Sequence, residues 1–148
     1  MIFFTMFLFL GLIGMEIFSY LIHRFLFHGI LWPIHKSHHI SGHHIFELND
    51  AFSVFFSLIS IGLIFSGDSW AFPLGLGMAL YGLLYFIIHD ILIHKRFLRI
   101  TISNRLVNHV KYEHQNHHQV VDKKGREPYG LFVFLKPTDF KRNKNVNE

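Results

Sequence analysis

The sequence predicts an all-α integral membrane protein with about three transmembrane helices and a histidine-rich helical cap on the cytoplasmic side. Two observations support this fold class: long apolar runs separated by polar segments, and thirteen His residues, more than the ten Asp and Glu residues combined. Apolar runs of this length favour a bilayer as solvent, and neutral imidazole is the commonest metal-binding side chain. At 148 residues the chain is within the range of a single domain, so we expect one active site.

The first predicted element is a transmembrane helix over residues 1–22. Residues 2–22 are apolar apart from Thr5, Glu16, Ser19 and Tyr20, and as a helix they would span about 31 Å, which matches the hydrocarbon core. A cleaved signal peptide is the alternative. The run has neither a basic start nor a small-residue cleavage site, and it is longer than a signal-peptide core, so we predict a helix that spans the membrane.

Residues 51–88 are predicted to form a transmembrane hairpin. Its first arm, 51–66, would be about 24 Å long, which is short for a full crossing, so this arm could be partly re-entrant. The turn Gly67-Asp68-Ser69 leads into the second arm, 70–88. Pro73 falls in the first turn of that arm, where a missing N–H does no harm.

All fourteen Lys and Arg residues lie in 23–50 or after residue 88. By the positive-inside tendency both regions face the cytoplasm, and one helix followed by a hairpin also brings them to the same side. The formal charge of +4 therefore indicates membrane orientation rather than nucleic-acid binding. Every His is predicted to lie on that cytoplasmic side.

The remaining segments are predicted as one histidine-rich cap and a tail. Residues 23–50 and 89–136 carry the histidine clusters, and the stretch 95–118 mixes apolar and basic residues as an interfacial or capping helix would. The short apolar run 131–135 is expected to cover the site or to enter the interface. Residues 137–148 are charged and Asn-rich, which is typical of a flexible tail.

Ten of the thirteen histidines fall into four clusters with helical spacing. The clusters are His23-x4-His28, His35-x2-His38-His39, His89-x4-His94 and His114-x2-His117-His118. On an α-helix, residues at i, i+3 and i+4 project from one face, so each three-histidine cluster presents its rings in one direction. Residues at i and i+5 are about 140° apart. Each pair with that spacing either straddles its helix and serves two neighbouring ions, or marks a local distortion.

This constellation indicates a site for two metal ions. Burying so many imidazoles without partners would cost about 1–3 kcal/mol each, and a pair of ions would supply the partners. Ten ligands are too many for one ion and suit two, with an open position at each. Imidazole alone does not distinguish Zn, Fe, Cu and Ni. The chain has no Cys and no Glu-x-x-His pair, which excludes thiolate-held clusters and carboxylate di-iron sites, and the absence of H-E-x-x-H weighs against a zincin protease.

The residues in and around the histidine clusters resemble those of a known family. Five parts of the chain carry the resemblance. They are His28-Gly29-x-x-Trp32, His35-Lys36-Ser37-His38-His39, Phe46-Glu47-Leu48-Asn49-Asp50, His89-Asp90-x-x-x-His94 with Arg96-Phe97, and His114 to His118 followed by Tyr129-Gly130-Leu131-Phe132. These pieces are similar to the fatty acid hydroxylase and sterol desaturase superfamily, and within it to the bacterial β-carotene 3-hydroxylases. One departure is the fourth cluster, which has Glu113, Gln115 and Asn116 where the family more often has basic and aliphatic residues.

The resemblance implies a di-iron monooxygenase of a bacterial cytoplasmic membrane. Its expected cofactors are two non-haem Fe ions with O2 as cosubstrate, its electron donor is a ferredoxin or a similar protein, and its substrate is a carotenoid. The implied reaction hydroxylates C3 of the β-ionone rings, from β-carotene to β-cryptoxanthin and zeaxanthin. A fatty-acyl or sterol hydroxylase or desaturase of the same superfamily is the nearest alternative. A membrane Zn or Ni carrier is remote, because its ligands would be strung through the bilayer.

Two further residues complete the predicted site, and three histidines are predicted to lie outside it. Glu16 lies seven residues before His23 on the same helix, and an ionisable group at that depth is a functional candidate. We expect Glu16, and likewise Asp90 beside His89, to support a ligand imidazole by hydrogen bonding. His43, His44 and His109 lie outside the helical register of their neighbours, so we predict that they are not ligands.

Overall fold

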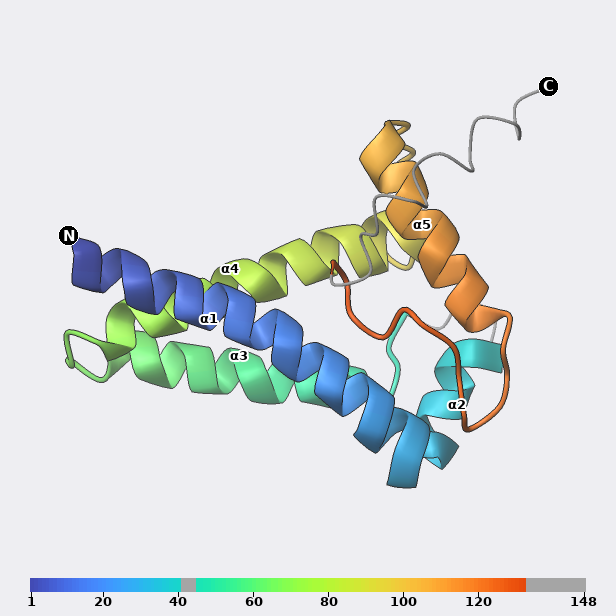
Figure 1. The fold of residues 1–148 in the computed structure, drawn as a ribbon, viewed down its shortest axis with the longest axis horizontal. Coiled ribbons are helices and arrows are strands. Elements are labelled where there is room, and N and C mark those ends of the chain that lie inside the picture. The colour runs from blue at the N-terminus through green and yellow to red at the C-terminus, as the bar shows by residue number, and fades with distance from the viewer. Residues whose placement is uncertain (41–44, 133–148) are drawn as a thin grey trace.

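The computed structural model describes residues 1–40 and 45–132, and all regular elements among them are helical (Figure 1). They are α1 (Ile2–Leu21), η1 (Ile22–Ile30), α2 (Trp32–Ile40), α3 (Asp50–Phe65), α4 (Ala71–Tyr85), η2 (Phe86–Ile93) and α5 (Arg105–His118), where η1 and η2 are π-helical. The predicted all-α fold class is therefore confirmed for the residues described.

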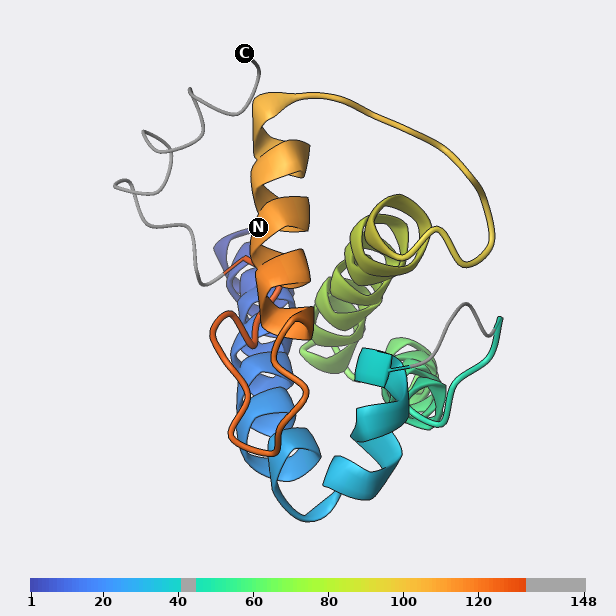
Figure 2. The ribbon, with the colours of Figure 1, turned by 90° about the vertical axis from the view of Figure 1, so that its right-hand side faces the viewer.

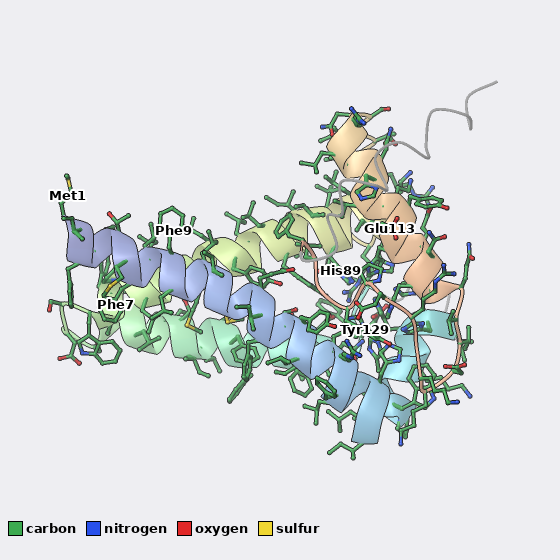
Figure 3. The ribbon with its side chains drawn as sticks, in the orientation of Figure 1. Met1, Phe7, Phe9, His89, Glu113 and Tyr129 are labelled. Carbon is green, nitrogen blue, oxygen red and sulfur yellow. The ribbon has the colours of Figure 1, made fainter. Side chains whose placement is uncertain are left out.

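The three long helices lie side by side, with α4 packed against both α1 and α3. The helices α2 and α5 gather at one end of this layer, and the N-terminus and the turn between α3 and α4 lie at the other end (Figures 1 and 2). With side chains drawn, His89 and Tyr129 lie at the end formed by α2 and α5, far from Met1 and Phe7 (Figure 3). The apolar helices thus hold the histidine-rich segments together at one end.

Glycine lets α4 approach both of its neighbours closely. Gly75 and Gly77 are two residues apart, about 200° around the helix, so they face opposite sides. A Cβ atom at Gly77 would lie 2.1 Å from the carbonyl oxygen of Leu8 in α1, and one at Gly75 would lie 2.8 Å from that of Ser60 in α3. The Ser60 hydroxyl also donates to the Gly75 carbonyl at 2.8 Å. Small residues of this kind allow close backbone packing between helices in lipid.

Two helices are long and apolar enough to cross a membrane: Ile2–Ile30, with a mean hydropathy of 2.0, and Ala71–Ile93, with 1.9. Only 11% and 28% of their most apolar segments are buried, so neither has the surroundings of a core helix in a soluble domain. The apolar helix α3 is shorter, at 16 residues. The structure thus contains two candidate membrane helices, and a crossing by α3 stays a prediction.

The first helix continues past residue 22, where we expected it to end, because η1 extends it to Ile30. Both π-helical segments carry a His-x4-His pair. Hydrogen bonds in a π-helix join residues five apart, so side chains five apart stack on one face. In η2, the N–H of His94 donates to the carbonyl of His89 at 2.9 Å, and their ring centroids are 4.5 Å apart. The distortion explains the i, i+5 spacing, and the alternative that each pair straddles its helix is wrong.

The predicted capping helix over 95–118 is shorter than expected. Helix α5 begins at Arg105, where the side-chain oxygen of Asn104 accepts the N–H of Val107 at 2.8 Å. Such a cap satisfies one of the free amides at a helix start, and it fixes the boundary. Residues 95–104 have no regular structure.

The apolar run 131–135 is described only as far as Phe132. Leu131 is buried against Ile93 and Val110, so this part of the run covers the junction of η2 and α5. The expected tail 137–148 lies outside the described residues.

The contact between α1 and α4 gives a matched pair of variants. A Cβ at Gly11 would lie 2.3 Å from the Leu74 carbonyl oxygen, whereas one at Gly14 meets nothing within 4 Å. Gly11→Ala should therefore lower the free energy of unfolding by about 1–3 kcal/mol through overpacking, and Gly14→Ala should not. Thermal unfolding of both variants in one detergent tests this, and equal midpoints would contradict the packing described.

Candidate metal centre

Five imidazoles from three helical segments converge on one point. The members of this first histidine group are His23, His28, His35, His39 and His117, and one nitrogen of each lies within 4.8 Å of the others. η1, α2 and α5 supply these rings. The first group therefore joins segments more than 90 residues apart in the chain, such as His23 and His117.

Four other imidazoles converge on a second point. The second histidine group consists of His38, His94, His114 and His118, whose ligand atoms also lie within 4.8 Å of one another. The two groups adjoin, since the rings of His39 and His118 stack with centroids 4.5 Å apart. Nine of the ten predicted ligands are thus brought together, as five and four.

The nitrogen spacing fits metal ions. Imidazole nitrogens bind such an ion at about 2.0–2.1 Å, so two of them at right angles around it lie about 3 Å apart. In the first group, the Nε2 atom of His23 lies 3.0 Å from that of His35 and 3.1 Å from that of His117. In the second group, the Nε2 atoms of His94 and His114 are 2.9 Å apart.

The tautomers of His23 and His117 also indicate a metal site. The Nδ1 atoms of His23 and His117 lie against the backbone carbonyls of Tyr129 and Arg126, which only accept, so each Nδ1 carries the proton and donates it. Both Nε2 atoms are then bare lone pairs, and they face each other at 3.1 Å. Two acceptors at that distance repel each other, whereas a cation between them would bind both. The residues present therefore fit a bound metal ion.

Burial keeps these rings neutral. Burial, with a smaller contribution from neighbouring imidazoles, lowers the pKa of His39 and of His94 to about 3 and that of His117 to about 4. Burial likewise lowers the pKa of His38 and of His114 well below the ordinary histidine value. Neutral imidazole is the form that binds metals, so the site is prepared for them at neutral pH.

His89 lies beside the second group without joining it. Its ring centroid is 4.5 Å from that of His94 and 4.8 Å from that of His114, but it is not among the four rings whose nitrogens converge. Its Nδ1 atom donates to the Asp90 carboxylate at 2.8 Å, which is the contact that we expected. The role of His89 as a ligand stays a prediction.

Glu16 is buried in α1, and its carboxylate holds two other parts of the chain. It accepts the hydroxyl of Tyr81 in α4 at 2.9 Å and the backbone N–H of Phe132 at 2.7 Å. The imidazole that we expected as its partner is not among these two contacts. Because the carbonyl of Tyr129 orients His23, Glu16 supports the site by anchoring the segment that includes Tyr129 and Phe132.

From the sequence, Tyr129 to Phe132 entered only the family resemblance and the run 131–135 was expected to cover the site, while residues 122–128 had no expected role. Residues 122–132 run along the first group, and their carbonyls orient His23 and His117. At Gly125 the backbone has a φ of 60°, and a Cβ there would lie 2.6 Å from the Nδ1 atom of His28. Only backbone fits at this point, so a glycine at a turn was the one available signal.

Three polar residues after α2 and η2, which had entered only the family resemblance, also support the rings. The carboxylate of Glu47 accepts from the Nδ1 atom of His38 at 2.6 Å, and the side-chain amide of Asn49 lies 3.0 Å from the Nδ1 atom of His35. Arg96 binds the carboxylates of Asp50 and Asp90. Carboxylates and amides commonly orient metal-binding imidazoles in this way.

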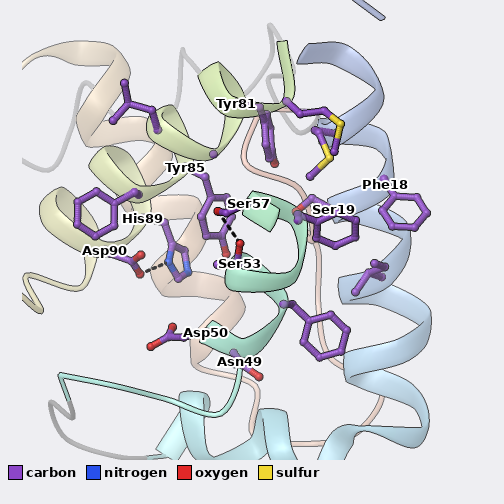
Figure 4. A pocket seen from close by; sticks show the side chains of 18 of the residues that line it. Phe18, Ser19, Asn49, Asp50, Ser53, Ser57, Tyr81, Tyr85, His89 and Asp90 are labelled. Carbon is purple, nitrogen blue, oxygen red and sulfur yellow. Dashed lines mark hydrogen bonds and ion pairs between the residues drawn. The ribbon is translucent and has the colours of Figure 1, made fainter. Parts of the chain in front are cut away.

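A cavity of about 450 Å³ lies between α1, α3 and α4 and reaches the histidines. Its wall is mainly apolar, with Phe18, Phe52, Phe56 and Ile64 among the lining residues. His23, His35, His38 and His89 line its inner end. Figure 4 shows His89 and Asp90 on one side of this space, with Ser53 and Ser57 of α3 beside them.

Three histidines were predicted not to be metal ligands, and the structure describes one of them. His109 is buried in α5, and it belongs to neither group. His43 and His44 lie outside the described residues, so the prediction that they are not ligands is untested.

The fold and the site define a helical protein with two candidate membrane helices and two histidine groups, each of which could hold a metal ion. Comparison with known proteins then identifies the family. The fatty acid hydroxylase family profile matches residues 8–139, and the chain belongs to this family.

Similar proteins from several organisms have β-carotene hydroxylase as their name. The chain is 39% identical over 134 residues to the β-carotene hydroxylase of Pseudescherichia vulneris, a match covering 88% of this chain and 76% of the relative. It is 38% identical over 133 residues to that of Pantoea ananas, covering 87% and 75%. For β-carotene 3-hydroxylase 2 of Arabidopsis thaliana, the match is 39% over 129 residues, covering 82% and 42%.

The family and these relatives make the chain an oxidoreductase enzyme, as we predicted. No solved structure matched in the comparison of folds.

The lowered histidine pKa values predict acid sensitivity of the metal-free protein. An unfolded chain takes up protons at these rings below about pH 6.5, whereas the folded chain does so only near the lowered pKa values, about 3 for His39 and His94 and about 4 for His117. The free energy of unfolding should therefore fall steadily from pH 6.5 towards pH 4. Thermal midpoints measured with a chelator present test this, and a flat profile over that range would contradict the burial described.

Substitution of Gly125 should cause a selective loss of bound metal. Gly125→Ala would push a methyl group against the His28 ring, so metal retention should fall at least tenfold. Gly67→Ala is the matched control, because Gly67 also has a positive φ, 84°, but a Cβ there meets nothing within 4 Å. Metal content after dialysis distinguishes the two variants, and equal retention would show that the contact with His28 is unimportant.

Proposed function

We propose that this chain is a β-carotene 3-hydroxylase that hydroxylates the β-ionone rings with O2, from β-carotene to β-cryptoxanthin and zeaxanthin. The observation that carries the proposal is the apolar cavity that ends at two converging histidine groups. The similarity to proteins named β-carotene hydroxylase supplies the substrate class.

Two non-haem iron ions are the proposed cofactors. The first group would hold one ion and the second group the other, with His89 available to the second ion. When bound, such an iron pair supplies the activation of O2 that hydroxylation of an unactivated C–H bond requires. His28, His35, His38, His39 and the other predicted ligands act by holding the pair at the end of the cavity.

The chain's own residues would position the substrate and exclude water. The aromatic and aliphatic wall between α1, α3 and α4 offers a hydrocarbon no hydrogen bonds, so a polyene would enter by burial of apolar surface. Its terminal ring would then lie beside His23, His35 and His89 at the inner end. Because the cavity lies among the apolar helices, substrate could reach it from the bilayer.

In the proposed membrane arrangement, residues 1–148 form a single domain with three crossings. The helices of 1–22 and 51–88 would cross, and the histidine segments 23–50 and 89–136 would face the cytoplasm. The positions of Lys and Arg support this orientation. A ferredoxin-type donor would deliver electrons there, because a basic surface attracts an acidic partner.

Pigment analysis tests the reaction. Expression in a β-carotene-producing bacterium should convert β-carotene into β-cryptoxanthin and zeaxanthin, measured by chromatography. Unchanged β-carotene in cells that contain folded, iron-loaded protein would contradict the proposal. Hydroxylated or desaturated acyl chains or sterols in the lipid extract would instead identify the fatty-acyl or sterol alternative.

A pair of histidines on α5 provides a matched test of the site. His114→Gln removes a member of the second group and should abolish hydroxylated pigment, with at least a hundredfold loss of rate. His109→Gln changes a buried histidine of the same helix that belongs to neither group, so product should persist. Loss of product in both variants, at equal protein levels, would contradict the assignment of ligands.

A further inference from the structure

The two histidine groups differ in the chemistry of their supports. In the first group, neutral backbone carbonyls accept the Nδ1 protons of His23 and His117. In the second group, the carboxylate of Glu47 accepts that of His38 at 2.6 Å. The neighbouring His89 donates in the same way to Asp90 at 2.8 Å.

One buried guanidinium, that of Arg96, contacts the Asp90 carboxylate directly and is linked to Glu47 only through Asp50. The Arg96 side chain is 4% exposed, and it contacts the two oxygens of Asp50 at 3.0 and 2.6 Å and one oxygen of Asp90 at 3.0 Å. It also donates to the carbonyl of Ile45 at 2.8 Å. Asp50 in turn accepts the backbone N–H of Glu47 at 2.9 Å. Arg96 therefore contacts the carboxylate that receives the His89 proton, and through Asp50 it is linked to the backbone of Glu47, whose carboxylate receives the His38 proton.

This geometry affects how strongly the rings bind a cation. A carboxylate that accepts the Nδ1 proton makes the imidazole a better donor to metal than a neutral carbonyl does. The planar guanidinium can contact two carboxylates and a carbonyl at once, which a lysine ammonium cannot do in the same fixed geometry. Without Arg96, the partly buried carboxylates of Asp50 and Asp90 would repel one another, and Glu47 and Asp90 would turn away from the rings.

We infer that Arg96 is a positioning residue for the second histidine group, and that its carboxylate frame makes this group bind iron more tightly than the first. The inference rests on the two-metal site of the proposed function. It concerns the binding of metal, so it is tested without turnover.

The experiment is a stepwise metal titration of the purified, full-length protein in detergent. Metal-free protein receives Fe(II) under anaerobic conditions, and a competing chelator reports the affinity of each step. Wild-type protein should bind two ions in steps that differ by about tenfold or more. His94→Ala removes a member of the second group, so the step that it abolishes identifies that group.

Arg96→Gln should weaken the tighter step by about ten- to a hundredfold and change the weaker step by less than about twofold. Arg96→Lys, which keeps the charge, should have an intermediate effect. Arg99→Gln is the control, because Arg99 is exposed in the irregular segment 95–104 and belongs to neither histidine group. This variant should leave both steps unchanged.

Two near-isosteric variants keep the inference testable if Arg96→Gln does not fold. Glu47→Gln and Asp90→Asn remove the charges that accept the imidazole protons, and each should weaken the same tighter step. Equal affinities of the two iron-binding steps in wild-type protein, or equal weakening of both steps by the Arg96 variants, would overturn this inference. The proposed function would not be affected by either result. Failure of wild-type protein to bind two ions would instead overturn the proposed function.

Discussion

Nine imidazole rings crowd around two points in this protein, and the remaining structure serves to keep them there. Rings whose Nδ1 atoms donate to the backbone, such as His23 and His117, turn bare lone pairs towards each other at 3.1 Å. That arrangement is repulsive unless a cation lies between the two atoms. The need to bring these lone pairs together, and to satisfy them, explains features of the chain from its helix geometry to its glycines.

Helix distortion is the first of these features. An α-helix would turn two histidines five residues apart in different directions, and the π-helical segments η1 and η2 turn them to the same side instead. The close contact of α1 with α4 at Gly11 and Gly77 then brings the two distorted ends together. In this way the packing of apolar helices determines where the imidazoles meet.

Polar contacts then orient individual rings. Glu16 is inside the apolar layer, yet it binds the backbone of Phe132 and so fixes the segment whose carbonyls receive imidazole protons. Arg96 likewise binds the carboxylate of Asp90 beside His89. It also binds Asp50, which accepts the backbone N–H of Glu47 beside His38. The apolar cavity between the helices ends where these two sets of contacts meet, which is where a hydrocarbon would be oxidised.

Much of this could be predicted from the sequence, because the signals were periodic. Apolar runs gave the helices, and the i, i+3, i+4 spacing of His35, His38 and His39 gave rings on one face. The prediction did not assign His38 and His39 to different groups, because that depends on how α2 meets α5 in space. It also gave no role to Gly125 or Arg96. Gly125 meets His28 and Arg96 binds Asp50, both far away in the chain, and spacing along a sequence carries no information about such contacts.

The central claim is that the nine converging histidines hold two iron ions. X-ray absorption spectroscopy of the iron-loaded protein, combined with metal and protein quantification, tests it most directly. We expect two irons per chain, each with several imidazole nitrogens at about 2.0–2.2 Å, because the nitrogens within each histidine group are spaced as ligands of one ion. A single iron per chain, or an iron environment made mainly of carboxylate oxygens, would contradict it.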